Sequence, residues 1–177
     1  SVVGSIINSG SIAGGNDGIE IDVTSFTGNL SNSGVITGAT GNGVDIEATN
    51  FTGSIINAAT GRIQADVNTA LAIDVTLMTG GLTNAGLIAG QDSGVRISNT
   101  NMTGPNANIV NSGTTQTADE TALHLASTVV GGTITNSGLI LSETSDAIDI
   151  NDGHVTGGIF NSGTISASDD ALELSDA

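Results

Sequence analysis

The sequence predicts an all-β fold, a single-domain parallel β-solenoid that occupies residues 1–177. Three observations predict it. An Asn-centred repeat recurs along the whole chain, aliphatic residues alternate with polar ones within each repeat, and the large side chains that fill one central core are scarce. Such a chain lines a thin, continuous core by stacking its repeats. We expect a right-handed, three-sided β-helix of seven coils of about 25 residues each.

Asparagine marks the same point of every repeat. The steps between successive members are 24, 25, 27, 27, 25 and 25 residues, and the most regular repeats read Gly-Ser-Ile-Ile-Asn-Ser-Gly-Ser-Ile (residues 4–12) and Gly-Thr-Ile-Thr-Asn-Ser-Gly-Leu-Ile (residues 132–140). Identical amides one strand spacing apart can hydrogen-bond along a stack, and Asn also tolerates a tight corner. We therefore expect a structural ladder of Asn8, Asn32, Asn57, Asn84, Asn111, Asn136 and Asn161.

Each repeat divides into three segments that meet at Gly-rich corners. Aliphatic residues alternate within a segment, as in Ile19-Glu20-Ile21, and a period of two is typical of a strand with one apolar face. Stacked coils then align their aliphatic residues in columns. The three columns we expect are Ile6, Leu30, Ile55, Leu82, Ile109, Ile134 and Ile159; Ile21, Ile46, Ile73, Ile97, Leu125, Ile150 and Leu174; and Phe26, Phe51, Met78, Met102, Val130 and Val155.

Three places depart from the regular repeat. Residues 58–62 lengthen one corner of the third repeat, and Pro105-Asn106-Ala107 are inserted in the fourth. Thr115 interrupts a further aliphatic column in the fifth, so we expect coil five to be the least tightly filled. The aliphatic members of that column are Ile12, Ile36, Ile63, Ile88, Ile140 and Ile165.

The net negative charge of the chain excludes two classes of binding partner, nucleic acid and anionic lipid. Two Arg against 18 Asp and Glu give a formal net charge of −16, so there are too few cations to displace the counterions of nucleic acid or to dock on anionic lipid. No apolar run reaches membrane-spanning length, and we expect no membrane insertion. The lack of Cys excludes disulfides and thiolate chemistry.

Five carboxylates form a grid on the outward positions of coils one to three: Glu20, Asp22, Asp45, Glu47 and Asp74. Stacked at about 4.8 Å, they repel one another unless the side chains splay into solvent or a hard cation bridges them. Oxygen ligands suit Ca²⁺. The grid is therefore a candidate Ca²⁺ site, and the alternative is a plain solvated acidic face.

An enzyme that acts on polysaccharides is an alternative function. Asp169-Asp170, or Asp149 with Glu173, could serve as an acid/base pair. The chain has no Trp or Tyr to stack on sugars and no basic cluster to bind uronates, while His124 and His154 fall in different coils. We therefore expect a chain that is not an enzyme and has no catalytic residues.

The repeated Asn-Ser-Gly-x-Ile, followed by Gly-Ile-x-Ile, resembles the β-helical passenger repeats of bacterial autotransporters and haemagglutinin-like adhesin exoproteins. The resemblance covers essentially the whole chain and concerns architecture rather than activity. It implies a secreted or cell-surface protein whose solenoid serves adhesion, self-association or reach. Its partners are then neighbouring solenoid repeats and a host-surface or polysaccharide ligand. A Ca²⁺-binding extracellular matrix module is a further alternative.

The spacing of the repeat also bears on self-association. Joining Ala177 to Ser1 would place the next Asn 24 residues on, which lies within the observed range of steps. Edge strands and an apolar column are a template for another chain. We expect copies to stack head to tail in a filament, or longer solenoid to flank this segment.

Overall fold

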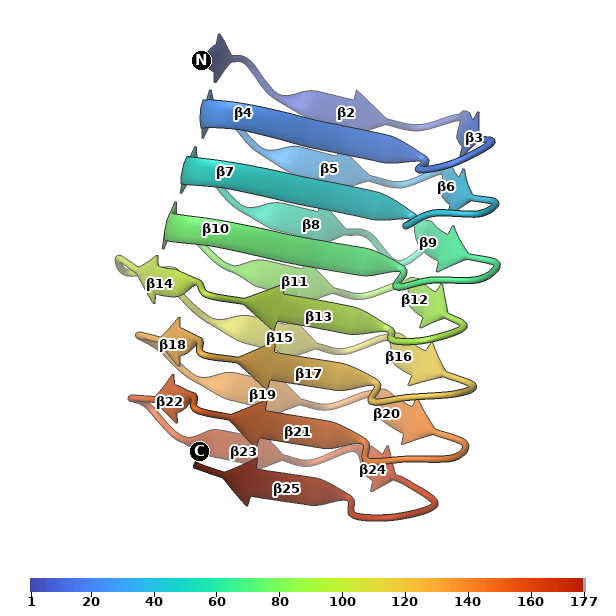
Figure 1. Ribbon diagram of the computed structural model, residues 1–177, viewed down its shortest axis with the longest axis vertical. Helices are drawn as coiled ribbons and strands as arrows, with labels where there is room; N and C mark the ends of the chain where they lie inside the picture. The colour runs from blue at the N-terminus through green and yellow to red at the C-terminus, as the bar shows by residue number, and fades with distance from the viewer. Residues whose placement is uncertain (177) are drawn as a thin grey trace.

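Every strand pairs in parallel with a strand of a neighbouring coil. In the computed structural model, which describes residues 1–176, 25 strands assemble into three parallel sheets that form the sides of a solenoid (Figure 1). Ala177 lies outside the described residues. No helix within residues 1–176 is long and apolar enough to cross a membrane.

Sheet B carries the Asn repeat. Each of its strands ends on the repeat Asn, and each pairs in register with the next, so that Ile6 faces Leu30 and Asn8 faces Asn32. The register is the one that the repeat predicts. The strands are β2 (Ile6–Asn8), β5 (Leu30–Asn32), β8 (Ile55–Asn57), β11 (Leu82–Asn84), β15 (Ile109–Asn111), β19 (Ile134–Asn136) and β23 (Ile159–Asn161).

Sheet C follows sheet B after a short corner. Its inward column is the one that Thr115 interrupts, and Ile88 pairs with Thr115 in the ladder. The strands are β3 (Ser11–Gly14), β6 (Val35–Gly38), β9 (Arg62–Ala65), β12 (Leu87–Gly90), β16 (Thr114–Thr117), β20 (Leu139–Ser142) and β24 (Thr164–Ser166).

Sheet A bends around a corner of the solenoid, and its strands are continuous in coils one to three but divided in coils four to six. The continuous strands are β4 (Ile19–Thr27), β7 (Val44–Thr52) and β10 (Leu71–Thr79). The remaining strands are β1 (Val2–Val3), β13 (Val95–Ser98), β14 (Asn101–Thr103), β17 (Leu123–Ala126), β18 (Val129–Val130), β21 (Ile148–Asn151), β22 (His154–Val155) and β25 (Leu172–Ser175).

The solenoid is right-handed. In Figure 1 the strands of sheet B run from left to right at the back, those of sheet A run from right to left at the front, and each coil lies below the previous one. Sheet C closes the right-hand side. The predicted fold is therefore confirmed: an all-β, single-domain parallel solenoid of about seven coils of about 25 residues.

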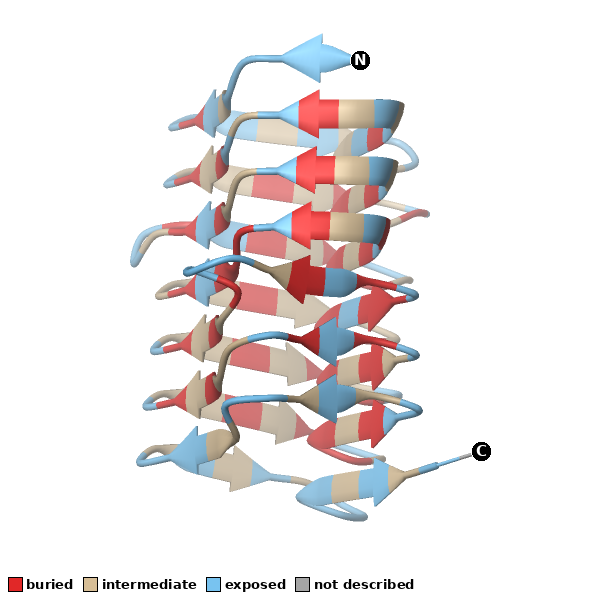
Figure 2. Cartoon of the chain, turned by 90° about the vertical axis from the view of Figure 1, so that its left-hand side faces the viewer, coloured by how far each residue is buried: buried red, intermediate tan, exposed pale blue. Residues whose placement is uncertain are grey.

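The core is a continuous column of aliphatic side chains inside the solenoid. Figure 2 shows buried residues on the inward positions of the middle coils, while coil seven is more exposed. The predicted columns align in the ladders, as Ile21 does with Ile46. Phe26 and Phe51 stack with their ring centroids 5.1 Å apart. Because each coil contacts only its neighbours, stability is a nearest-neighbour sum.

Coil five has a small hollow beside Thr115, of about 10 Å³. Threonine is shorter than the isoleucines of the column and carries a hydroxyl that must find a partner when buried. Thr115 Oγ1 donates to Asn111 Oδ1 and accepts from Asn84 Nδ2, both at 3.2 Å. The core thus has a small opening where Thr115 interrupts the column, and bonding to the Asn ladder satisfies the hydroxyl.

The inserted residues of the fourth repeat lie between β14 and β15, where residues 104–108 belong to no strand. Gly104 has a φ of 93°, which favours glycine. Ala107 is buried at 1 % exposure and belongs to the core. Pro105 and Asn106 are exposed, so only this part of the insertion lies outside the core. The ladder is not interrupted, since Leu82 still pairs with Ile109.

Candidate functional site

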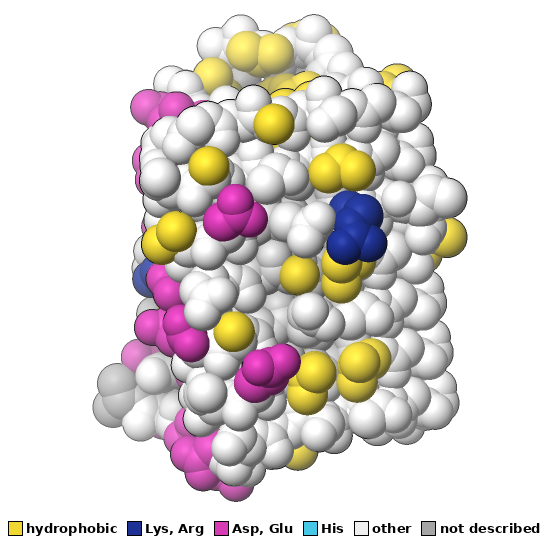
Figure 3. All heavy atoms as spheres, turned by 90° about the vertical axis from the view of Figure 1, so that its right-hand side faces the viewer, with side chains coloured by type: hydrophobic (Ala, Val, Ile, Leu, Met, Phe, Trp, Pro, Cys, Tyr) yellow, Lys and Arg dark blue, Asp and Glu magenta, His cyan; other side chains and the backbone are white. Residues whose placement is uncertain are grey.

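The outward face of sheet A carries the predicted acidic grid. The ladder pairs Glu20 with Asp45, Asp22 with Glu47, and Glu47 with Asp74. The five carboxylates thus form two adjacent columns on β4, β7 and β10, as expected. Figure 3, which views sheet C, shows the acidic side chains gathered along the margin that turns toward sheet A.

Mutual repulsion and burial raise the pKa of two grid residues. The pKa of Asp45 is raised first by burial and then by the charges of Asp17 and Asp74, although a hydrogen bond from Asn42 opposes the shift. The pKa of Glu47 is raised chiefly by the charge of Asp45, with smaller effects from burial and its other acidic neighbours. The grid therefore favours any partner that brings positive charge.

The structure does not draw the grid into metal-binding distance. Within residues 1–176, the group whose ligand atoms all lie within 4.8 Å of one another is Asp146, Asp169 and Asp170. Calcium binding at the grid stays a prediction. It is tested by whether millimolar Ca²⁺ raises the melting temperature more than Na⁺ of equal ionic strength.

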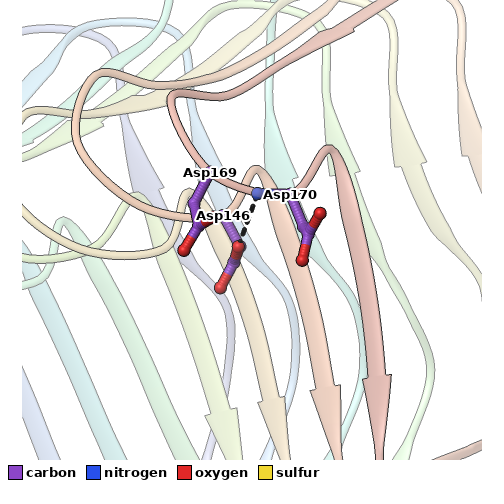
Figure 4. Close-up of side chains that lie close together, drawn as sticks. All are labelled: Asp146, Asp169 and Asp170. Atoms are coloured by element: carbon purple, nitrogen blue, oxygen red, sulfur yellow. Dashed lines mark hydrogen bonds between the residues drawn. The ribbon is translucent and has the colours of Figure 1, made fainter.

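The aspartate group Asp146, Asp169 and Asp170 lies where the loops before β21 and β25 stack (Figure 4). The Asp170 backbone N–H donates to Asp146 Oδ1 at 2.9 Å. Asp146 is 9 % exposed, whereas the other two are exposed. Three carboxylate oxygens would suit a hard divalent cation, but one oxygen of Asp146 already caps a backbone amide, so the group also has a structural role.

Asp146 was not among the residues singled out from the sequence. The signal lay in the repeat: Asp146 precedes Ala147 in coil six as Asp170 precedes Ala171 in coil seven. Aligning the two coils stacks the two carboxylates. The backbone ladder confirms this alignment, since the Ala147 N–H donates to the Asp170 carbonyl at 3.0 Å.

The proposed acid/base pair Asp149 and Glu173 forms one column with His124. His124 Nε2 lies 3.4 Å from Asp149 Oδ2, and Asp149 pairs with Glu173 in the ladder. Burial raises the pKa of Asp149, while His124 lowers it. The charge of Asp149, followed by a side-chain contact with Asp146, raises the pKa of Glu173. The sequence analysis paired Asp149 with Glu173 but did not anticipate the contact of Asp149 with His124.

Comparison with known proteins adds no relative. No protein-family model matches the chain, and no curated protein or solved structure matches it significantly. The resemblance to bacterial surface solenoids therefore rests on the repeat itself.

Proposed function

We propose that the chain is a non-catalytic structural segment, a stiff rod within a secreted protein of the bacterial surface. The observation that carries this proposal is the Asn ladder. In each of its six steps, the side-chain Nδ2 of one Asn donates to Oδ1 of the next at 2.8 or 2.9 Å. The ladder runs through every coil, as expected for a segment whose role is to span a distance.

The ladder also locks neighbouring coils against sliding. Nδ2 of Asn32 donates to the backbone carbonyl of Arg62 in the next coil at 3.1 Å, and Nδ2 of Asn84 does the same to Thr114 at 2.9 Å. A buried amide with its partners supplied fixes one register, because a slip would leave polar groups unpaired. Register locking supports a role in which the rod holds its shape.

Further coils, from the same chain or from another copy, are the partner that this proposal names. Leu172 and Leu174 on β25 are 41 % and 65 % exposed, whereas their ladder neighbours Ile148 and Ile150 are buried. A parallel strand added below β25 would cover them. Sedimentation at increasing protein concentration tests head-to-tail stacking: linear growth supports it, and a constant monomer mass contradicts it.

Export to the cell surface and adhesion are part of the proposal. They are supported by the resemblance of the Asn-Ser-Gly-x-Ile repeat to the passenger repeats of bacterial surface proteins. A rod of this kind would hold a host-surface or polysaccharide-binding part away from the cell.

Coil deletion tests the rod. Removing residues 112–136 joins Asn111 to Ser137 and takes out one whole repeat of 25 residues. A stack of near-equivalent coils should refold, shortened by about one strand spacing of 4.8 Å, as measured by circular dichroism and small-angle X-ray scattering. Removing only residues 112–124 should abolish the cooperative melt, because the register is lost. Equal unfolding of both deletions would contradict a modular rod.

The enzyme alternative has its own test. The chain is incubated with neutral and acidic polysaccharides, and new reducing ends and unsaturated uronates are measured. A structural segment releases no more than a heat-denatured control. Saturable release that Asp149→Asn or Asp170→Asn abolishes would establish catalysis and overturn the proposal.

A further inference from the structure

Sheet B is the uncharged side of a strongly acidic molecule. Its strands and the corners on either side of them contain no Asp, Glu, Arg or His, within residues 4–10, 28–34, 53–61, 80–86, 104–113, 131–138 and 157–163. The 18 acidic residues lie on or between strands of sheet A, in the corners that lead to it from sheet C, or directly after its last strand. In Figure 3, the margin that turns toward sheet B, at the right, carries no acidic side chain.

The outward surface of sheet B is a column of alternating composition. The middle residue of each strand points away from the core, and the ladder aligns these residues in register. Coils one, three, five and seven supply the apolar side chains Ile7, Ile56, Val110 and Phe160, and coils two, four and six supply the hydroxyl side chains Ser31, Thr83 and Thr135. Ile7 and Phe160 are 77 % and 56 % exposed. Apolar side chains repeated along one uncharged face, rather than scattered, indicate an interaction surface.

The distribution of charge favours a second copy of the chain as the partner of this face. With a net charge of −16, two copies repel wherever their acidic sides approach each other. The corner between sheets C and A, where many of the carboxylates lie, is the one corner that sheet B does not share. Contact through sheet B therefore turns both acidic corners outward and brings the least like charge together.

We propose that two copies pack side by side, sheet B against sheet B, with their solenoid axes antiparallel. A two-fold axis parallel to the strands sets coil seven of one copy opposite coil two of the other, coil six opposite coil three, and coil five opposite coil four. Each apolar residue then meets a hydroxyl residue: Phe160 meets Ser31, Ile56 meets Thr135, and Val110 meets Thr83. The largest side chain of the column thus lies opposite the smallest. Such a contact is isologous, so it closes at two copies.

The contact has the size of a weak, reversible interface. Six paired strands at about 4.8 Å give a height of about 29 Å, and five residues across the face at about 3.3 Å give a width of about 16 Å. The two copies together bury roughly 900 Å², which is less than most stable complexes bury. We therefore expect a monomer–dimer equilibrium that favours the dimer only at high protein concentration.

The two lengthened corners of the molecule fit this arrangement. Residues 58–61 follow β8 and residues 104–108 precede β15, so neither replaces a strand residue of sheet B. In the antiparallel pair, the first corner meets Ser137 and Gly138 of the other copy, and the second meets Gly131 and Gly132. These are short corners, and glycine leaves the most room because it has no side chain.

Lateral pairing goes beyond the rod proposal and uses a different surface from head-to-tail stacking, whose contact lies at the ends of the solenoid. Pairing stops at two copies, whereas stacking grows linearly. The amides that respond also differ, since pairing affects the middle strands of sheet B and stacking affects the terminal strands. Failure of one contact is therefore distinguishable from failure of the other.

Sedimentation equilibrium and ¹⁵N–¹H NMR on the same samples, over micromolar to millimolar concentrations, test the pairing. The expected mass rises reversibly and levels off at two copies. The amide shifts that accompany this rise should be concentrated in the strands of sheet B, around Ile56, Thr83 and Val110, and should leave sheet A unchanged.

Variants complete the test. Thr83→Glu places a charge at the centre of the paired face and should weaken dimerisation at least about tenfold, since two like charges are brought together. Ile56→Ser should weaken it severalfold, because apolar contact is lost. The matched control is Thr76→Glu, which adds the same charge at an exposed position of sheet A and should dimerise nearly as the unaltered chain does. A dispersed amide spectrum verifies that each variant is folded.

Three results would overturn the pairing. The first is a mass and a sheet B spectrum that do not change with concentration. The second is dimerisation that Thr83→Glu weakens no more than Thr76→Glu does. The third is a chain that stays monomeric while a neutral polysaccharide or zwitterionic lipid vesicles shift the sheet B amides, which would assign this face to that ligand.

Discussion

Coils one to three and coils four to six build the same repeat with different backbones. In the first region, sheet A runs around its corner as the unbroken nine-residue strands β4, β7 and β10. In the second region each strand is divided, and a residue with a φ near 50° stands in the gap. These residues are Asn99, Ser127 and Asp152.

The division follows from one position of the repeat. Where coil three has Val75, coil four has Asn99, and a polar side chain of this type tolerates the left-handed conformation that valine avoids. The next residue then changes sides, because Thr76 is exposed but Thr100 is buried. The comparison teaches that one polar substitution redirects the backbone while the ladder register on both sides of it is kept.

The buried hydroxyl of Thr100 joins the two regions. Thr100 Oγ1 accepts from the Val75 backbone N–H at 3.1 Å and donates to the Ser98 carbonyl at 2.8 Å. A backbone donor that loses its strand partner at the division is thus satisfied by a side chain. In coil five, Thr128 Oγ1 likewise lies 3.0 Å from the Ala126 carbonyl two residues before it, but its second partner is the Ile97 carbonyl, also at 3.0 Å, and not a backbone N–H.

The largest expected effect comes from cutting the ladder that both regions share, at their boundary. Asn84→Ala should lower the free energy of unfolding by about 1–3 kcal/mol, because the buried amides of Asn57 and Asn111 each lose one hydrogen-bond partner. Chemical denaturation measures it. Asn8→Ala is the control and should cost less, since Asn8 has an Asn neighbour on one side only. An unchanged melt for Asn84→Ala would remove the ladder from the account of stability.

Removal of the Thr100 hydroxyl should give the next largest loss of stability. It tests directly whether this hydroxyl joins the two regions. Thr100→Val keeps the shape but leaves the Val75 N–H unpaired in the interior, which should cost about 1–2 kcal/mol. Thr76 is the equivalent residue of coil three and is exposed, so Thr76→Val should change stability little. If chemical denaturation shows an equal loss of free energy of unfolding in both variants, the hydroxyl does not bridge the two regions.

Substitutions at the division of the strand should have a smaller effect on stability. Asn99→Ala places an ordinary side chain in the left-handed region, at a cost of about 1 kcal/mol. Asn99→Gly keeps the backbone conformation accessible while also losing the contact with Asp74, so it should be milder. If glycine proves as destabilising as alanine in thermal melts, the contact and not the conformation decides stability at this corner.

The sequence was sufficient for the fold because its repeat sets the register. Once Asn8 lies above Asn32, alternation within each segment decides which side chains face inward, and Ile21 and its counterparts follow. The division at Asn99 could not be predicted in this way, because alternation alone places Asn99 inward and Thr100 outward. The structure instead lets the left-handed conformation reverse them.

The candidate site was predictable to the level of columns. The two acidic columns follow from the register, but the burial of Asp45 and its hydrogen bond with Asn42 do not. Asp146 illustrates the other limit, because its closeness to Asp169 arises from two stacked loops rather than from a strand. The residues that stack in strands can be predicted from periodicity. The residues that approach one another in loops can be identified only from the structure.

Mild acidification should stabilise the protein, and the acidic grid of coils one to three should contribute to the effect. The pKa of Asp45 is raised mainly by burial, and that of Glu47 mainly by the charge of Asp45. The folded state therefore binds these protons more tightly than the unfolded chain does. The free energy of unfolding then rises as pH falls through the folded pKa values, and levels off below the ordinary values of 3.8 for Asp and 4.5 for Glu.

Calorimetric melts of the unaltered chain between about pH 7 and about pH 4.5 measure this rise. The double variant Asp45→Asn/Glu47→Gln should start from a higher melting temperature at neutral pH and show a flatter dependence, because the repulsion has already been removed. In the second region, Asp149→Asn/Glu173→Gln is the matched pair, since both of these pKa values are raised as well. Each pair should remove part of the slope. A melting temperature that falls from neutral pH toward pH 5, or a slope that neither pair reduces, would show that solvent screens these carboxylates too well for their crowding to affect stability.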